Sequence, residues 1–293
     1  MLTEPALAES LQRAWGLTGA RVSVHNGGMG SQTWFVDLGD QRWVAKAVDA
    51  QSGEQLAGGL ALAGRLEQAG IPAGAAVPAA GGQLCIPVAD DWLALLTWVP
   101  GQPLTGRDSR EQDLIGTTMA RVHRALAGYE VTGGQRFHWV DPAADYLSLR
   151  PWLRPAVTSA VRGLDAARPD TMTAGLLHAD PAPDAFRLDP ATGRCGIIDW
   201  SYAQHGPLLY DLASAVMYVG GPARATALTG AYLRAGLLGA AEVADGLEPM
   251  VRFRWAVQAS YFAWRIAGNN LTGIGGPDEN EKGLEDARRA LVS

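Results

Sequence analysis

The sequence predicts an α+β protein of two lobes, in which a small antiparallel sheet with one long helix precedes a larger, mainly helical lobe. Three features predict this: alternating strand patterns over residues 21–50, a change of character after Pro100–Pro103, and an Ala-rich helical pattern from residue 208 onward. Strands followed by helices, instead of a regular alternation of the two, favour segregated layers over a doubly wound sheet. We therefore place the lobes at residues 1–97 and 98–293.

The first lobe is predicted element by element from the spacing of its apolar residues. Alternation predicts strands and a spacing of three to four predicts helices. On these grounds we expect helices over 4–16 and 53–69 and strands over 21–25, 34–38, 42–48, 83–88 and 92–99. The pair Gly39-Asp40 is typical of a hairpin turn and joins two of these strands.

The second lobe is predicted to be helical apart from one polar segment. Helical spacing covers residues 108–128 and, with proline breaks, 141–168, and it resumes from 208 to the end. The segment 176–200 has a β-type pattern and contains most of the chemically active side chains.

Composition excludes several classes of protein. Hydrophobic residues make up 47% of the 293-residue chain and charged residues 18%, so the chain is not intrinsically disordered. A net charge of −6 disfavours a nucleic-acid polymer as partner and suits a neutral or cationic small molecule. The start of the chain lacks the basic region of a signal peptide, and no apolar run reaches the roughly 18 residues of a membrane span. Cys85 and Cys195 are too few for a disulfide framework and are expected to be buried thiols, so we expect a cytoplasmic protein with no membrane partner; its oligomeric state stays open.

Two aspartates follow apolar strand-like runs in the polar segment. Asp180 comes after Leu176-Leu177-His178-Ala179, and Asp199 comes after Ile197-Ile198. If the strands are neighbours, one carboxylate can accept a proton from a hydroxyl while the other holds a divalent cation. The alternative is a pair of turn aspartates that cap local backbone.

The order and spacing of these motifs resemble the aminoglycoside phosphotransferase family, which has the protein-kinase-like fold and includes choline, homoserine and fructosamine kinases. The residues that carry the resemblance are Gly27-Gly28-Met29-Gly30-Ser31, Lys46, Ile115-Gly116 with Val122-His123, His178-Ala179-Asp180, Ile197-Ile198-Asp199-Trp200, and Gly206–Ala213. Lys46 also lies between two alanines in an apolar strand, where a bound phosphate would compensate a buried charge.

The resemblance implies an ATP- and Mg²⁺-dependent transfer of phosphate to a hydroxyl of a small molecule. It implies that Asp180 is the catalytic residue and that Asp199 binds Mg²⁺, with His178 and Asp211 as structural supports of the loop. It also implies that the nucleotide is bound by Gly28, Gly30, Ser31, Lys46, Trp98 and Val99. An aminoglycoside or another antibiotic is one candidate acceptor, which would make the protein a resistance enzyme.

The sequence departs from the family at three positions that concern activity, one of which is Gly206, where the family has the first aspartate of its Gly-Asp-Pro segment. Ala185 stands where the family has a metal-binding asparagine, and we expect the adjacent Asp184 to serve as the replacement ligand. Gly59 stands where the family has the glutamate that pairs with the nucleotide lysine, so Lys46 needs another partner. The alternative function is therefore a catalytically impaired pseudokinase or ligand sensor on the same fold.

The acceptor pocket is expected among the C-terminal helices. Its candidate residues are Trp255, Tyr261, Trp264 and the acidic segment Asp278-Glu279-Asn280-Glu281. The alternatives are that the aromatic residues belong to the core and that the acidic segment is a solvated face.

Overall fold

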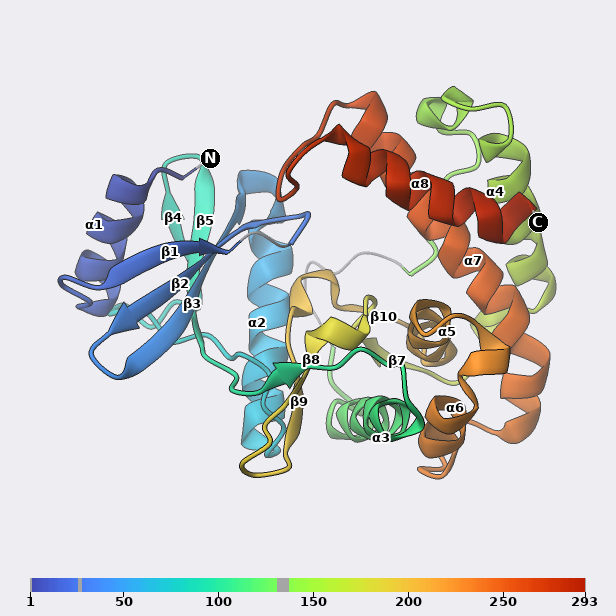
Figure 1. Ribbon diagram of the computed structural model, residues 1–293, viewed down its shortest axis with the longest axis horizontal. Helices are drawn as coiled ribbons and strands as arrows, with labels where there is room; N and C mark the ends of the chain where they lie inside the picture. The colour runs from blue at the N-terminus through green and yellow to red at the C-terminus, as the bar shows by residue number, and fades with distance from the viewer. Residues whose placement is uncertain (1, 26–27, 131–136, 293) are drawn as a thin grey trace.

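The computed structural model describes residues 2–25, 28–130 and 137–292, and it has the expected two-lobed α+β architecture (Figure 1). Its helices are α1 (Glu4–Trp15), α2 (Gly53–Gln68), α3 (Ser109–Ala125), α4 (Leu153–Ala166), α5 (Leu209–Tyr218), α6 (Thr226–Leu233), α7 (Ala240–Ala267) and α8 (Pro277–Val292). Its strands are β1 (Arg21–His25), β2 (Gln32–Leu38), β3 (Gln41–Asp49), β4 (Ile86–Val88), β5 (Asp91–Thr97), β6 (Gln102–Pro103), β7 (Ala174–Leu177), β8 (Phe186–Leu188), β9 (Cys195–Ile197) and β10 (Gln204–Pro207).

The first lobe contains an antiparallel sheet with the strand order β1-β2-β3-β5-β4. The hairpin between β2 and β3 turns at Gly39 and Asp40 as predicted, and Gly39 has a left-handed φ of 58° that suits glycine. β4 covers only the end of the predicted strand 83–88, and β5 ends two residues before Val99.

The two faces of this sheet are covered by different helices. Leu7 and Leu11 of α1 belong to the same buried cluster as Ala45 and Ala47 of β3. On the other face, Leu56 and Leu60 of α2 pack with Val48 of β3 and Ala94 of β5. Because side chains alternate along a strand, Lys46 points to the α2 face, towards the second lobe.

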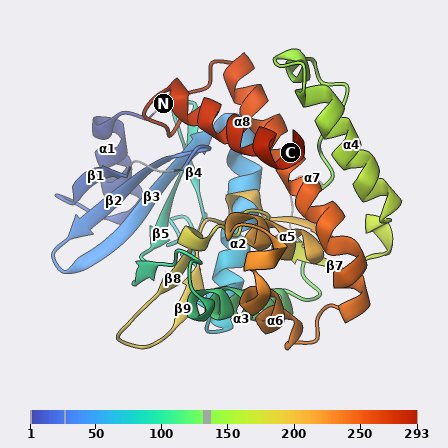
Figure 2. The same ribbon diagram turned by 45° about the vertical axis from the view of Figure 1, so that its right-hand side comes forward.

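The second lobe is built around α7, which packs against α4, α5 and α8 (Figure 2). The predicted helix over 141–168 is wrong in its first half, where the chain forms only a 3-10 turn over Asp145–Ser148. Pro142 and Pro151 account for this, because proline disfavours the helical conformation of the residue before it. The helix proper begins at Leu153.

Short strands deliver the polar segment to the space between the lobes. β7 pairs with β10, while β9 pairs with β8, which in turn pairs with β6. Asp180 and Asp199 therefore follow strands of two different sheets, not neighbouring strands of one. Both cysteines are free and buried, as expected. None of the described helices is long and apolar enough to cross a bilayer.

Candidate active site

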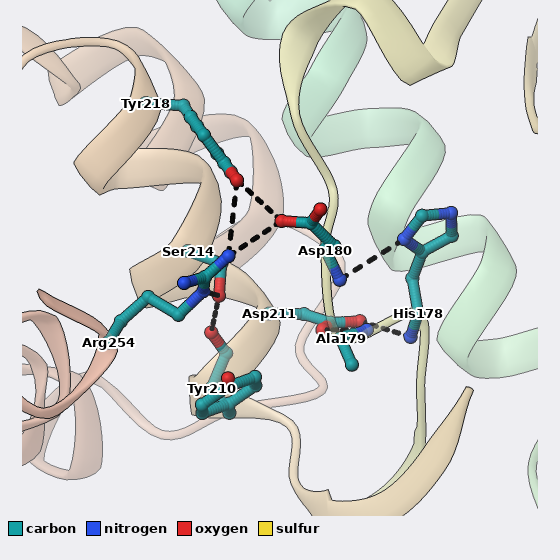
Figure 3. A network of polar contacts seen from close by, with 8 residues as sticks. All are labelled: His178, Ala179, Asp180, Tyr210, Asp211, Ser214, Tyr218 and Arg254. Carbon is teal, nitrogen blue, oxygen red and sulfur yellow. Dashed lines mark hydrogen bonds and ion pairs between the residues drawn. The ribbon is translucent and has the colours of Figure 1, made fainter. Parts of the chain in front are cut away.

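The loop after β7 places Asp180 through two backbone hydrogen bonds to one buried carboxylate (Figure 3). Asp211, in the first turn of α5, accepts from the backbone N–H of His178 at 2.7 Å and from that of Ala179 at 2.8 Å. Ala179 has a φ of 71°, a left-handed conformation that residues other than glycine seldom adopt. The two hydrogen bonds hold this strained turn, which directs Asp180 away from the sheet.

Asp211 is itself held by a hydrogen bond to His123 of helix α3. The imidazole Nε2 of His123 lies 3.0 Å from Oδ2 of Asp211, and its Nδ1 lies 2.7 Å from the hydroxyl of Tyr232. A carboxylate only accepts, so Nε2 donates and the tyrosine hydroxyl donates to Nδ1. Each member of this network has a partner, which is what a buried polar group requires.

The side chain of His178 joins the two aspartate loops. Its Nε2 donates to the backbone carbonyl of Ile198 at 2.9 Å, so Nδ1 is free to accept from the backbone N–H of Asp180 at 3.3 Å. The ring packs edge-on against Trp200, with 4.7 Å between centroids. One imidazole thus sets the spacing between the loop of Asp180 and the loop of Asp199.

Asp199 forms an ion pair with Lys46 across the two lobes. The Lys46 Nζ lies 2.6 Å from Asp199 Oδ1, and the aspartate keeps 46% of its side chain exposed. Desolvation would raise the pKa of Asp199, but the attraction and hydrogen bond of Lys46 outweigh it and hold that pKa at about 2. Asp199 is therefore ionised at neutral pH, and it also has a left-handed φ of 73°.

The loss of the helix glutamate at Gly59 has a steric reason. A Cβ atom at Gly59 would lie 2.2 Å from the backbone carbonyl oxygen of Trp200, so no side chain fits there. Helix α2 instead meets the backbone of the 3-10 turn η5 (Trp200–Tyr202) directly. Lys46 has Asp199 as its partner in place of a glutamate.

The glycine-rich turn between β1 and β2 lies next to the 3-10 turn η5. Gly28 has a φ of 114°, and the N–H of Ser31 donates to its carbonyl at 3.4 Å. A Cβ atom at Gly30 would lie 2.4 Å from the hydroxyl oxygen of Tyr202, so the turn approaches η5 closely. Gly27 lies outside the described residues.

Trp98 and Val99 lie directly after β5, where the chain leaves the sheet. The Trp98 ring packs edge-on against Phe35, 5.6 Å between centroids, and faces the guanidinium of Arg42 at 5.4 Å. Val99 is buried, and the guanidinium of Arg187 donates to the carbonyl of Gly101 at 2.9 Å. Residues before and after the connection therefore hold it: Phe35 and Arg42 contact Trp98, and Arg187 binds Gly101.

Asp184 lies in a 3-10 turn, Pro183–Ala185, and its side chain is exposed. Burial lowers the pKa of the neighbouring Arg187, which the attraction of Asp184 partly offsets. The carbonyl of Ala185 accepts from the backbone N–H of Ile198 at 3.0 Å. This bond ties the turn to the residue before Asp199.

Two partners of Asp180 escaped sequence reasoning (Figure 3). Its Oδ1 accepts from Arg254 Nη2 at 2.6 Å and from the hydroxyl of Tyr218 at 2.5 Å, and Arg254 also donates to the hydroxyl of Ser214 at 3.1 Å. Burial lowers the pKa of Arg254, but the oxygens of Tyr218, Tyr210 and Asp180 raise it by more than burial lowers it. The net pKa lies above its ordinary value, so the guanidinium stays charged. The signal in the sequence that could have indicated this partner is an arginine among the apolar residues of the run that forms α7.

A cavity of about 450 Å³ begins beside Tyr218. It lies where α5, α7 and α8 meet, and its lining consists of Met217, Tyr218, Trp255, Gln258, Asp286, Arg289 and Ala290. Of the aromatic residues predicted for an acceptor pocket, Trp255 lines this cavity, whereas Trp264 is 49% exposed. The segment Asp278–Glu281 is the first turn of α8; its three acidic residues are exposed, as a solvated face predicts, and Asn280 alone among the four is buried.

Comparison with known proteins places the chain among phosphotransferases. Residues 21–248 match the phosphotransferase enzyme family. A homoserine kinase of Azorhizobium caulinodans is 32% identical over 130 residues, a stretch that covers 41% of this chain and 39% of that protein.

Solved structures show the same fold at low sequence identity. An amicoumacin kinase, solved with AMP-PNP and Ca²⁺, superposes with a TM-score of 0.76 at 15% identity over 99% of this chain and 93% of its own. A microcompartment-associated aminopropanol kinase also gives 0.76, at 17% identity over 99% and 96%. The chain therefore belongs to the phosphotransferase enzyme family and has its protein-kinase-like fold.

Proposed function

We propose that the protein is a small-molecule kinase that transfers the γ-phosphate of ATP to a hydroxyl group. The observation that carries this is the convergence of Lys46, Asp199 and Asp180, with His178 as the bridge between the two aspartate loops. Phosphoryl transfer needs positioning and charge neutralisation more than covalent chemistry, and this set provides both.

Asp180 is suited to hold the acceptor hydroxyl. Arg254 and Tyr218 both donate to Oδ1, which leaves Oδ2 to accept the hydroxyl proton of the acceptor. The acceptor oxygen then forms a bond to the γ-phosphorus as the bond to the departing ADP oxygen breaks. Lys46 would contact the phosphates, and the turn at Gly28, Gly30 and Ser31 would cover them.

The carboxylates at the site fit a Mg²⁺ ion that arrives with the nucleotide. No group of three or more His, Cys, Asp or Glu side chains that could hold a metal occurs in the described parts of the chain. Mg²⁺ does not need one, because it is commonly held by one or two carboxylates together with substrate phosphates. Asp199 is ionised and half-exposed, and we propose Asp184 as the second ligand in place of the family's asparagine. When bound, Mg²⁺ supplies charge neutralisation at the phosphates.

Asp184→Ala tests the second ligand. We expect a higher Mg²⁺ concentration for half-maximal activity, because a charged oxygen ligand is lost. Asp170→Ala is a matched control, since Asp170 is also exposed and also follows a proline in a 3-10 turn. If the two variants have the same Mg²⁺ dependence, Asp184 is not a ligand.

We propose a compact hydroxylated amine as the acceptor. The relative named above phosphorylates homoserine by its name, and one structural neighbour is an aminopropanol kinase. The cavity next to Tyr218 is lined by Trp255, which gives an apolar surface, and by Asp286 and Arg289, which pair with Lys282 and Glu285 on α8. Its volume of about 450 Å³ suits a small ligand.

The decisive experiment is ATP consumption with Mg²⁺ over homoserine, amino alcohols, choline and aminoglycosides. We expect turnover with a small hydroxylated amine that is lost in Asp180→Asn. Turnover with an aminoglycoside alone would support the kinase and overturn the proposed acceptor class. ATP binding without turnover over the whole panel would favour a pseudokinase. The pseudokinase is the second candidate function because Ala185 stands where the family has a metal-binding asparagine.

A further inference from the structure

Arg265, near the end of α7, is completely buried and reaches the glycine-rich turn of the other lobe. Its Nη1 donates to the carbonyl of Met29 at 2.6 Å, across 236 positions of sequence. Its remaining bonds stay within the helical lobe: Nε to Asn280 Oδ1 at 2.8 Å, Nη1 to the Tyr261 hydroxyl at 3.1 Å, and Nη2 to the Thr272 carbonyl at 2.7 Å.

The acceptors of Arg265 are neutral. Each is a carbonyl, an amide or a hydroxyl oxygen, and no ion pair of Arg265 occurs among residues 2–25, 28–130 and 137–292. A buried charge without a counter-charge is costly, and hydrogen bonds offset only part of that cost. Burying a hydrophobic residue of similar size would cost less free energy. The role of the guanidinium is therefore to hold the carbonyl groups of Met29 and Thr272 in place.

The connection between α7 and α8 also touches the turn by its backbone (Figure 1). Gly273 has a φ of 73°, and a Cβ atom there would lie 2.0 Å from the carbonyl oxygen of Gly28 and 2.8 Å from its carbonyl carbon. Only glycine allows this approach. Arg265 and Gly273 thus contact two neighbouring residues of the same turn, Met29 and Gly28.

We propose that Arg265 and Gly273 are positioning residues that hold the turn 28–31 over the nucleotide phosphates. The helical lobe then sets the affinity for ATP, because a turn that is already in place loses less conformational entropy on binding. This inference rests on the proposed placement of the nucleotide beneath the turn.

Helix α7 connects this contact to the acceptor side. Arg254, the partner of Asp180, precedes Arg265 by eleven residues, about three helical turns, so both side chains lie on the same face of one helix. A single rigid element therefore places both the turn over the phosphates and the carboxylate that faces the acceptor.

Gly273→Ala is the first test, with Gly236→Ala as its control. Gly236 has nearly the same φ, 71°, but no atom within 4 Å of an added Cβ, so the control carries the same backbone strain without the clash. We expect the Kd of Mg·AMP-PNP to rise about tenfold in Gly273→Ala relative to Gly236→Ala, with the KM of the acceptor unchanged. Equal nucleotide affinity in the two variants would overturn the proposal.

Arg265→Lys is the second test and keeps the charge while it removes the forked donor geometry. Arg252→Lys is its control, because Arg252 of the same helix donates to the carbonyl of Leu291 and touches neither loop nor turn. We expect weaker nucleotide binding only at position 265. If Arg265→Lys does not fold, the glycine pair alone decides.

Lys46→Met separates failure of this inference from failure of the nucleotide site. If Lys46→Met binds Mg·AMP-PNP as tightly as the unaltered protein, the nucleotide does not lie where we place it. If Lys46→Met loses affinity while Gly273→Ala matches Gly236→Ala, the site stands and the grip on the turn is refuted.

Discussion

The two aspartates of the site are held in opposite ways. Asp199 pairs with Lys46, which comes from the sheet of the other lobe, and it remains 46% exposed. Asp180 pairs with Arg254 and Tyr218, both from helices of its own lobe, and it is exposed to a similar extent, 40%. One carboxylate therefore depends on how the lobes meet, and the other does not.

This difference divides the expected chemistry between two halves of the site. We expect the Lys46–Asp199 half to contact the phosphates and the metal, so its substitution should change nucleotide binding. The Asp180–Arg254 half is prebuilt within the helical lobe, so its substitution changes turnover. The predictions below are ways to break that division.

Asp180→Asn is expected to have the largest effect. The amide cannot take up the acceptor proton, and we expect kcat to fall by at least ~10²-fold, the usual scale of acid–base assistance. Steady-state kinetics with saturating ATP and acceptor measure it. An unchanged kcat would remove Asp180 from the mechanism.

Lys46→Met and Asp199→Asn are expected to raise the KM for ATP by about tenfold each. Because the two side chains form one ion pair, their effects should not add in the double variant. A double-mutant cycle on KM tests this. Strict additivity would mean that the pair acts as two independent groups.

Arg254→Met is expected to act on stability as well as on turnover. It removes the hydrogen bond from Nη2 to Oδ1 of Asp180, worth about 1–3 kcal/mol of unfolding free energy, and it leaves Tyr218 as the remaining donor to that oxygen. Urea unfolding measures the first effect and kcat the second. Arg252→Met should change neither by as much, since Arg252 makes its bond to the end of α8.

The smallest expected effect is the pH dependence of the Lys46–Asp199 pair. The pKa of Asp199 is about 2, below its ordinary 3.8, so the pair stabilises the fold above pH 4 and loses that contribution as the pH falls towards 2. The stability difference between the unaltered protein and Asp199→Asn should therefore shrink over this range in urea titrations. A difference that stays constant from pH 5 to pH 2 would contradict the low pKa.

Sequence patterns predicted the sheet better than the site. Alternation and the turn at Gly39 predicted the strands around Lys46, because local spacing determines which face a strand residue occupies. The carboxylates at 180 and 199 were likewise marked by the apolar runs before them. The boundary between the lobes after residue 97 stays a prediction.

The partners of those carboxylates could not be predicted in this way. Arg254 lies 74 positions from Asp180, inside a helix whose pattern indicates only burial. Arg265 meets Met29 across almost the whole chain. Such contacts follow from the tertiary packing of α7 within the helical lobe and of the glycine-rich turn near its end, which no local spacing encodes. The pairing of Lys46 was open for the same reason, since the backbone contact at Gly59 is tertiary.

The division into a nucleotide half and an acceptor half is tested most directly by calorimetry with Mg·AMP-PNP on Lys46→Met beside Asp180→Asn. The structure predicts a Kd at least about tenfold higher in Lys46→Met and a Kd within about twofold of the unaltered protein in Asp180→Asn. Equal losses of affinity in the two variants, or a loss in Asp180→Asn alone, would contradict it.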